Sequence, residues 1–376
     1  MPGGNPFPGS FGPNAAFIPS GNFVPQQPDA KATTVYTWNL AIQHQIGTSW
    51  LVSATYLGTQ TIHIWGTEQL NPAVLVPGPR GSCPPGVTTG CNAVSNTNQR
   101  RLASLLNPQE GRFLSYVDQY NSGGTGSYHG LILSTQRRLS RGVSLNANYT
   151  WSHCIADINQ ASWVGSVGSG LNDPNNRRFD RGNCLSQTGG GNLVDQSLDR
   201  RHIVNFTAVL EAPKFNARTM RMVASDWKLS SSYRFLSGAF LNPYTGIDFA
   251  LNGDGTTRER PNQVLANPLC DNPRPSCWIN PAAFKQPDYG TFGNLGRSSV
   301  PGPGYWGIDM ALSRIFRVRE RMSLEARGEA FNLTNSFRAG ASGQLSVVTS
   351  RSSPQFGQIL VAQDPRILQV AAKLVF

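Results

Sequence analysis

The chain has 376 residues, of which 14% are charged, and its formal net charge is +11. Soluble domains usually carry about 25% charged residues, whereas no run here approaches the roughly 18 apolar residues of a transmembrane helix, so neither a typical soluble domain nor a helical membrane protein fits. The arginines are scattered in ones and twos and form no basic run or helix, so we expect no nucleic-acid partner.

Residues 1–31 are predicted to form an irregular segment, because Pro, Gly and Asn recur throughout it. The segment has neither the basic start nor the apolar core of a secretion signal. Residues 32–376 are predicted to form one β-domain. Its first hairpin pairs residues 35–46 with residues 50–65 through a tight turn at Gly47.

Three further hairpins and a last strand follow, each with alternating apolar and polar side chains. Residues 143–151 show the pattern most clearly, since Leu145 and Ala147 alternate with Asn146 and Asn148. The predicted pairs are 128–139 with 143–151, 202–212 with 226–240 through a turn of about a dozen residues, and 305–318 with 322–336; the last strand is 367–376.

The connections between these strands alternate between short and long. A transmembrane β-barrel has this order, because its short turns lie on the periplasmic side and its long loops lie outside. We therefore predict an all-β fold, an antiparallel transmembrane β-barrel segment of about nine strands. Single-chain bacterial barrels have an even number of strands, so we expect the chain to be the C-terminal part of a larger barrel.

Aromatic residues lie near the predicted outer ends of the strands, as in an aromatic girdle. They are Tyr36, Trp65, Tyr128, Trp151, Tyr305 and Trp306. The last strand ends on an aromatic, Phe376, which shares a face with Leu368 and Val370. A terminal aromatic on an alternating strand resembles the closing strand of outer-membrane barrels, which places Phe376 at the periplasmic end.

Six cysteines fall into three local pairs, in predicted outer loops or at their edges. None forms a C-x-x-C motif, so a zinc site is poorly supported and we expect no metal. Paired loop cysteines favour disulfides in an oxidising compartment, with free thiols as the alternative. The expected bridges are Cys83–Cys91, Cys154–Cys184 and Cys270–Cys277.

Short motifs recur in order along nearly the whole chain after residue 31. They are Trp38-Asn-Leu-Ala-Ile-Gln-His-Gln-Ile-Gly47, Leu51-Val-Ser-Ala-Thr-Tyr-Leu-Gly58, Ala147-Asn-Tyr-Thr-Trp-Ser-His-Cys154, Asp199-Arg-Arg-His-Ile203, Phe292-Gly-Asn-Leu-Gly-Arg297, Glu329-Ala-Phe-Asn-Leu-Thr-Asn335, Phe356-Gly-Gln-Ile359 and Asp364-Pro-Arg366. Together they resemble the barrels of Oar-like TonB-dependent receptors.

This resemblance implies an outer-membrane receptor or transporter of a Gram-negative-type bacterium, in which residues 32–376 supply the C-terminal barrel wall and the loops for uptake of a ligand. Its partners would be outer-membrane lipid, the ligand, and a TonB-type energy-coupling complex where a plug domain lies upstream. Neither a plug nor a coupling box is visible in the chain, and no cofactor is expected.

No catalytic motif such as G-x-S-x-G, H-E-x-x-H or a P-loop occurs, so we expect no enzyme activity. The strongest ligand-contact candidates lie together on a predicted outer loop, which offers guanidinium groups and one aromatic ring. They are Arg177, Arg178, Phe179, Asp180 and Arg181. Bracing of the loop by internal Arg–Asp pairs is the alternative.

Two other functions remain open at this point. One is an outer-membrane surface or adhesion protein, whose loops bind matrix, polysaccharide or another cell. The other is a soluble secreted β-protein that binds carbohydrate. Dependence on detergent separates the membrane readings from the soluble one.

Overall fold

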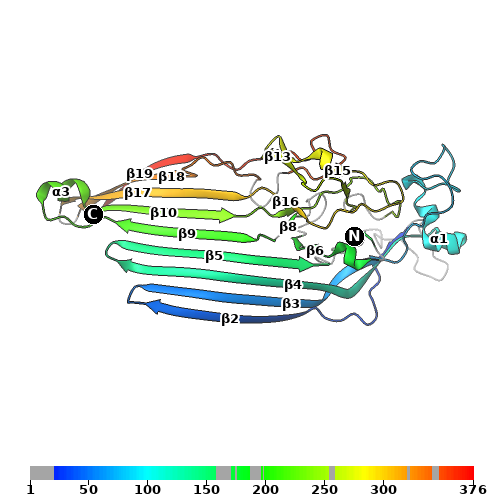
Figure 1. The fold of residues 1–376 in the computed structure, drawn as a ribbon, viewed down its shortest axis with the longest axis horizontal. Helices are drawn as coiled ribbons and strands as arrows, with labels where there is room; N and C mark the ends of the chain where they lie inside the picture. Colours follow the sequence, from blue (N-terminus) through cyan, green and yellow to red (C-terminus); the bar gives the residue numbers. More distant parts are fainter. Residues whose placement is uncertain are drawn as a thin grey trace, which may run out of the picture.

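The computed structural model describes residues 21–157, 171–173, 176–186, 196–197, 199–253, 259–319, 322–340 and 347–376. Nine long strands follow one another across a sheet in the order β19-β18-β17-β10-β9-β5-β4-β3-β2 (Figure 1). They are β2 (Thr34–Ile46), β3 (Trp50–Gln69), β4 (Leu114–Ser140), β5 (Val143–Ala156), β9 (His202–Glu211), β10 (Trp227–Leu236), β17 (Tyr305–Arg319), β18 (Met322–Phe331) and β19 (Ile367–Val375). Each predicted strand corresponds to one of these, which confirms the predicted antiparallel barrel-segment fold.

The register of the sheet keeps its two faces chemically distinct. One row across β4, β5, β9, β10 and β17 is entirely apolar: Leu133, Tyr149, Val204, Phe235 and Trp306. The neighbouring row is polar apart from one glycine: Ser134, Asn148, Asn205, Arg234 and Gly307. Because side chains alternate with a period of two, the apolar row marks the lipid-facing side of the wall and the polar row marks the lumen side.

The wall has no protein core of its own. Large apolar side chains of β2 and β19 are exposed, and Val370 keeps 88% of its surface exposed. The core cluster of the described residues lies instead among the long loops, and it includes Leu241, Ile279, Phe284, Val300 and Phe356. This distribution suits a wall whose apolar face meets lipid, because hydrocarbon takes the place of a protein core.

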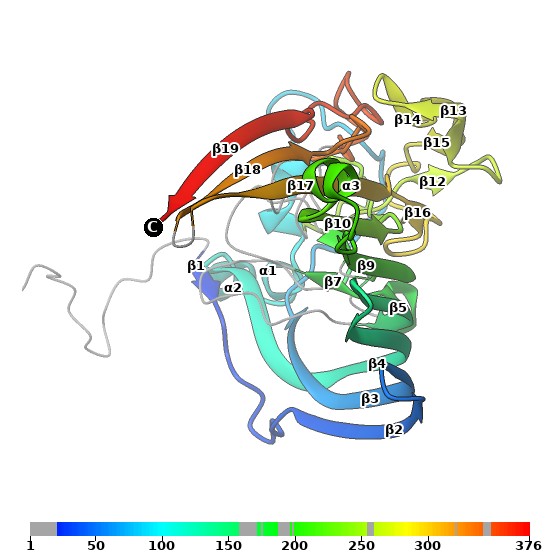
Figure 2. The ribbon, with the colours of Figure 1, turned by 90° about the vertical axis from the view of Figure 1, so that its left-hand side faces the viewer.

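The sheet is curved into an open arc, which is visible along the strand direction in Figure 2. Strands β2 and β19 form its edges: within the described residues β2 pairs only with β3, and β19 only with β18. Closure of a barrel through the strand that ends at Phe376 therefore stays a prediction.

The β3–β4 hairpin extends further than the sequence indicates. A loop is expected from Gly66 onward, yet β3 continues to Gln69 and β4 begins at Leu114. The pairing passes through two register shifts near His63, whose φ is +57°. Residues 21–31, assigned to the irregular segment, contain the short strand β1 (Gly21–Phe23), which pairs in parallel with β4.

The girdle prediction is only partly correct. Tyr36, Trp151 and Trp306 lie in the lipid-facing rows, whereas Tyr128 and Tyr305 occupy the opposite face of β4 and β17. The position of an aromatic residue near a strand end thus predicts its depth in the membrane but not whether it faces lipid or the lumen. The face alternates from one residue to the next along the strand.

The remaining elements are short and lie in the connections. They are η1 (Val94–Asn96), η2 (Asn98–Arg100), α1 (Leu102–Leu106), α2 (Pro108–Gly111), η3 (Arg177–Asp180), β6 (Gly182–Asn183), β7 (Leu185–Ser186), β8 (Gln196–Ser197), α3 (Arg218–Ala224), β11 (Phe240–Leu241), β12 (Asn262–Gln263), β13 (Leu269–Arg274), β14 (Cys277–Ile279), η4 (Pro281–Ala283), β15 (Phe284–Lys285) and β16 (Val300–Pro301). None of the helices in the described part of the chain is long and apolar enough to cross a membrane.

Candidate ligand-binding loops

The long connections gather at one end of the wall, opposite α3 and the C-terminus (Figure 1). Elements α1, β13, β15 and β16 all lie at this end. Phe284 and Phe356, which come from different connections, meet edge to face with ring centroids 5.7 Å apart. The loops are therefore packed against one another, which positions the side chains that they expose.

The candidate segment of residues 177–181 is held by a buried ion pair. The Arg260 Nη1 atom lies 2.6 Å from Asp180 Oδ1, and each side chain is 2% exposed. The same guanidinium stacks over the Phe179 ring at 4.5 Å and donates to the Phe179 carbonyl oxygen at 2.9 Å. Two of the five candidates, Phe179 and Asp180, thus contribute to bracing of the loop, as the alternative interpretation expects.

A second arginine joins this segment to the end of β5. Arg297 Nη1 donates to the carbonyl oxygens of Asp157, at 2.7 Å, and Asp180, at 2.9 Å. The Asp157 carboxylate accepts from the Thr125 amide on β4, also at 2.7 Å. The ends of β4 and β5 and the candidate loop are thereby tied together by charge-assisted hydrogen bonds, which are the stronger kind.

The other three candidates lie nearer the surface. The side chains of Arg178 and Arg181 are exposed, and Arg181 donates to the Thr125 hydroxyl at 3.0 Å. Arg177 is half-buried and donates to Asn121 Oδ1 at 3.3 Å. The structure therefore places two exposed arginines on a segment whose backbone is held by hydrogen bonds from Arg260 and Arg297.

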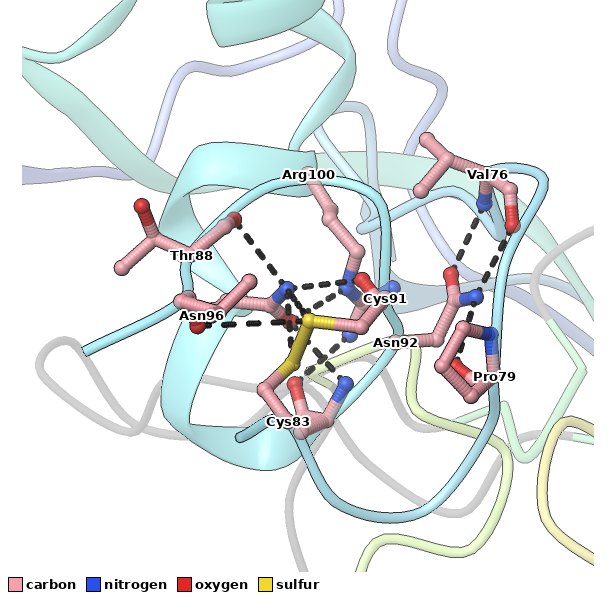
Figure 3. The surroundings of a disulfide bond; sticks show 10 residues. Val76, Pro79, Cys83, Thr88, Cys91, Asn92, Asn96 and Arg100 are labelled. Carbon is pink, nitrogen blue, oxygen red and sulfur yellow. Dashed lines mark hydrogen bonds between the residues drawn. A yellow bond between two sulfur atoms is a disulfide. The ribbon is translucent and has the colours of Figure 1, made fainter. Parts of the chain in front are cut away.

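The first long connection is organised around the Cys83–Cys91 disulfide and a buried arginine (Figure 3). Asn96 donates to the Cys91 carbonyl oxygen at 2.8 Å and accepts from Arg100 Nε at 2.7 Å. Arg100 also donates to the carbonyl oxygens of Val74 and Leu251. A further hydrogen bond joins Arg100 to the Ala93 carbonyl oxygen. Burial lowers the pKa of Arg100 from its ordinary value, and its four carbonyl and amide acceptors offset the cost of the buried charge.

Two buried carboxyl groups lie beside each other in the third long connection. Burial and the neighbouring Asp248 charge raise the pKa of Glu259 to about 9. Its carboxyl group accepts from the amides of Phe249, at 2.7 Å, and Ala250, at 3.2 Å, and hydrogen-bonds with Asp248. The raised pKa favours one proton held between the Glu259 and Asp248 carboxyl groups at neutral pH.

The other four cysteines are also joined in pairs. Cys154 at the outer end of β5 bonds to Cys184, and Cys270 of β13 bonds to Cys277 of β14. Among the described residues there is no group of three His, Cys, Asp or Glu side chains that could hold a metal ion. The sequence Asn252-Gly-Asp-Gly-Thr256 lies largely outside the described residues. Its side-chain oxygens resemble those of a calcium-binding loop, but the sequence lacks the carboxylates that follow in such a loop.

Sequence reasoning misses the residues that organise the loops. Arg100, Arg260 and Arg297 are each at most 5% exposed. No periodicity or motif distinguishes Arg100 and Arg260 from the exposed arginines, and the motif that ends at Arg297 does not indicate that its side chain is buried. For Arg260 the sequence offers one indication of burial. In a chain with few charges, the adjacent residues Glu259 and Arg260, followed by a proline, suggest that the loop contains an internal ion pair. The sequence does not indicate the partner, because Asp180 lies 80 residues away.

An antiparallel wall with one apolar and one polar face, carrying packed loops at one end, defines a segment of a transmembrane β-barrel. The model of the family described as the outer membrane beta barrel domain matches residues 2–369, and the chain belongs to this family. The protein accordingly resides in the outer membrane, and the soluble secreted alternative is wrong.

Solved structures of outer-membrane transporters are similar to the chain at low identity. The transporter YddB from Escherichia coli is 10% identical, with a TM-score of 0.40, over 95% of this chain and 34% of its own. The ferric-catecholate import receptor Fiu from E. coli K12 is 13% identical, with a TM-score of 0.40, over 97% of this chain and 30% of its own. The chain thus spans about a third of the length of these proteins. The comparison with curated proteins finds no match.

Proposed function

We propose that the chain forms part of the barrel wall and the outer loops of a TonB-dependent receptor of the Oar-like type, which takes up a ligand across the outer membrane. The proposed role is transport, not catalysis. The polar lumen face provides a wettable inner wall for a passage, and the TonB-type complex would act through a plug domain of the whole protein.

The observation that carries this proposal is the braced loop of residues 176–186. Its two exposed guanidinium groups, on Arg178 and Arg181, stand on a backbone held by the Arg260–Asp180 pair. A binding group held rigidly before the ligand arrives loses less entropy on binding. Guanidinium forks match carboxylate and phosphate oxygens in particular, so we propose an anionic ligand for this loop.

The proposal can be tested with the whole protein in its natural outer membrane. Loss of the protein should stop depletion of at least one anionic compound from the growth medium, and a protonophore should stop the same depletion. Substitution of both Arg178 and Arg181 by alanine should reduce uptake of that compound. Arg274→Ala, which removes an exposed arginine from β13, serves as the matched control and should leave uptake unchanged.

Two results would contradict the proposal in different ways. If no compound is depleted in a manner that requires the protein and the energised membrane, the transport role is wrong. If such a compound exists but its uptake is indifferent to the double substitution, transport stands and the assignment of the loop is wrong.

A further inference from the structure

The connection between β9 and β10 differs from the other turns at its end of the wall. The β2–β3 and β4–β5 turns are only a few residues long, whereas residues 212–226 contain α3 (Arg218–Ala224). Figure 1 shows α3 beyond the strand ends, on the side opposite the long loops. In an outer-membrane barrel the end with short turns is the periplasmic end. Because α3 lies at the opposite end from the proposed ligand-binding loops, its presence requires a different explanation.

Two side chains of the lipid-facing rows hold α3 in place. Trp227 Nε1 donates to the Val223 carbonyl oxygen at 2.8 Å, and the Arg314 guanidinium donates to the Met222 carbonyl oxygen. Trp227 and Arg314 are direct partners across β10 and β17, on the same face of the sheet as the next pair, Leu229 and Leu312. The C-terminal end of α3 is consequently attached to the lipid-facing side of the wall rather than over the lumen.

The helix and its flanks expose apolar side chains. Met220, Met222 and Val223 keep 49%, 64% and 61% of their surfaces exposed. Met220 and Val223 are three positions apart and so share one side of the helix. Three neighbouring apolar side chains left in water would be unfavourable, whereas the acyl–headgroup boundary of a bilayer would accommodate them.

The charged side chains between residues 212 and 225 are all basic, and Asp226 follows immediately before β10. Lys214, Arg218 and Arg221 are all exposed, and no Asp or Glu occurs between residues 212 and 225. Arg218 and Arg221, three positions apart, lie on a different side of the helix from Met220 and Val223, and Met222, four positions after Arg218, lies on the basic side. A short helix with an apolar side and a basic side is the pattern of an interfacial segment that lies on an anionic bilayer.

We propose that α3 is an interfacial anchor that binds anionic phospholipid in the periplasmic leaflet of the outer membrane. Met220 and Val223 enter the acyl–headgroup boundary, and Lys214, Arg218 and Arg221 contact the headgroup phosphates.

The attachment of α3 favours lipid over a protein partner. Arg314 stacks over Trp227 at 5.2 Å and over Phe316 at 4.8 Å, and all three side chains belong to the lipid-facing rows. The Trp50–Arg137 pair on β3 and β4 repeats this stacking at 5.5 Å. Aromatic and basic side chains mark the level of the membrane interface, so α3 begins where the lipid-facing surface reaches the headgroups.

A fluorescent probe at residue 223 tests the proposal in the whole protein. The six cysteines of this chain are joined in pairs, so Val223→Cys adds one thiol for an environment-sensitive dye, and labelling of the unsubstituted whole protein gives the background to subtract. The labelled protein is placed in bilayers of phosphatidylcholine, with or without phosphatidylglycerol. We expect a blue-shifted emission that is quenched by lipid-borne nitroxides, and a larger shift with phosphatidylglycerol. A Thr48→Cys variant in the β2–β3 turn is the control and should report water in both lipids.

A second set of variants tests the charges. Substitution of both Arg218 and Arg221 by glutamate, in the labelled protein, should abolish the additional shift caused by phosphatidylglycerol. Arg141→Glu changes an exposed arginine in the β4–β5 turn at the same end and should preserve that shift.

Two outcomes would overturn the anchor. One is a dye at residue 223 that is quenched by aqueous iodide and not by lipid nitroxides in both bilayers. The other is protection of the dye that increases with the density of protein in the bilayer instead of with phosphatidylglycerol, because this would show a second copy on α3.

Discussion

Buried arginines determine the conformation of the outer loops. The side chains of Arg100 and Arg260 are each 2% exposed. A guanidinium group has five donors and no acceptor, so it can be buried only where carbonyl or carboxylate oxygens converge. Arg100 meets backbone and amide oxygens, whereas Arg260 meets the Asp180 carboxylate and two backbone carbonyls. Each arginine thus links chain segments that are distant in sequence.

The Arg260–Asp180 pair provides a direct test of this organisation. Asp180→Ala leaves the Arg260 charge buried without its counter-ion, which should reduce the local stability of residues 176–186 by about 3–5 kcal/mol. Hydrogen exchange of peptides from this segment, in the membrane-embedded protein, measures the loss. Glu211→Ala removes one partner of the exposed Lys228–Glu211 pair, whose atoms are 3.9 Å apart, and should cost at most about 1 kcal/mol. Similar losses in both variants would show that the buried pair does not brace the loop.

Glu259 makes the third long connection sensitive to pH. The pKa of its carboxyl group rises from 4.5 to about 9 on folding. Between these values the folded loop holds a proton that the unfolded loop releases, so increasing pH favours opening, and the stabilisation is lost as pH passes the folded value. We expect exchange of the Phe249 and Ala250 amides, relative to their intrinsic rates, to become faster from about pH 5 to about pH 9.

The Glu259→Gln variant is the matched control for this effect. Its amide can donate to Asp248 and accept from the Phe249 amide as the protonated acid does, but it does not titrate. Exchange in the variant, corrected for intrinsic rates, should be independent of pH across the same interval. The same pH dependence in both proteins would assign it to another group.

At the scale of the strands, alternation assigns each side chain to lipid or to the lumen. Ala147 of β5 stands between Thr135 and Phe206 in a lipid-facing row. Asn148 stands between Ser134 and Asn205 in a lumen-facing row and accepts from Asn205 Nδ2 at 2.9 Å. Consecutive residues therefore lie in two different solvents.

Adjacent arginine substitutions in β5 measure this contrast. Ala147→Arg should cost about 2–4 kcal/mol, because a basic side chain on the lipid-facing surface near the middle of the membrane is poorly solvated. Asn148→Arg should cost much less, since water in the lumen can hydrate the charge. Reversible folding of the whole barrel into lipid vesicles gives both values. Equal penalties would show that the faces of β5 are assigned wrongly.

At the scale of the molecule, the wall and the loops draw their stability from different sources. The wall depends on backbone hydrogen bonds between strands and on lipid around its apolar face. The loops contain the core of Leu241, Ile279 and Phe284, together with disulfides and buried ion pairs. Destabilisation of the loops should therefore leave most of the strand pairing in the wall intact.

Reduction of the disulfides tests this separation. Each bridge is expected to contribute about 2–4 kcal/mol by restricting the unfolded chain, and less where the loop is otherwise ordered. Reduction of the membrane-embedded protein should increase proteolysis around Cys83–Cys91 and Cys270–Cys277, while the strand content measured by circular dichroism stays constant. Mass spectrometry of unreduced peptides should find all three bridges. Loss of strand content on reduction would contradict the separation.

The positions of the long strands and the alternation of their two faces follow from the amino-acid sequence alone. An alternation such as Leu145-Asn-Ala147-Asn-Tyr149 permits only one orientation of the strand. One face of a membrane wall contacts lipid and the other contacts water, and a shift by one residue would move every side chain to the wrong face. Three of the four hairpins follow from short turns, which can join only antiparallel neighbours, and the hairpin of β9 and β10 follows from the alternation in its two arms. The nine long strands and their order are therefore predictable from the sequence, whereas the extension of β3 to Gln69 and the start of β4 at Leu114 are not.

The arrangement of the loops depends on contacts between segments that are distant in the sequence. Asp180 meets Arg260 across 80 residues, and Arg100 meets the Leu251 carbonyl oxygen across 151. The role of α3 depends in the same way on Trp227 and Arg314, which are far apart in the chain and adjacent in the sheet. Irregular segments have no period that assigns a side chain to a face, so their contacts are set by which segments the wall brings together.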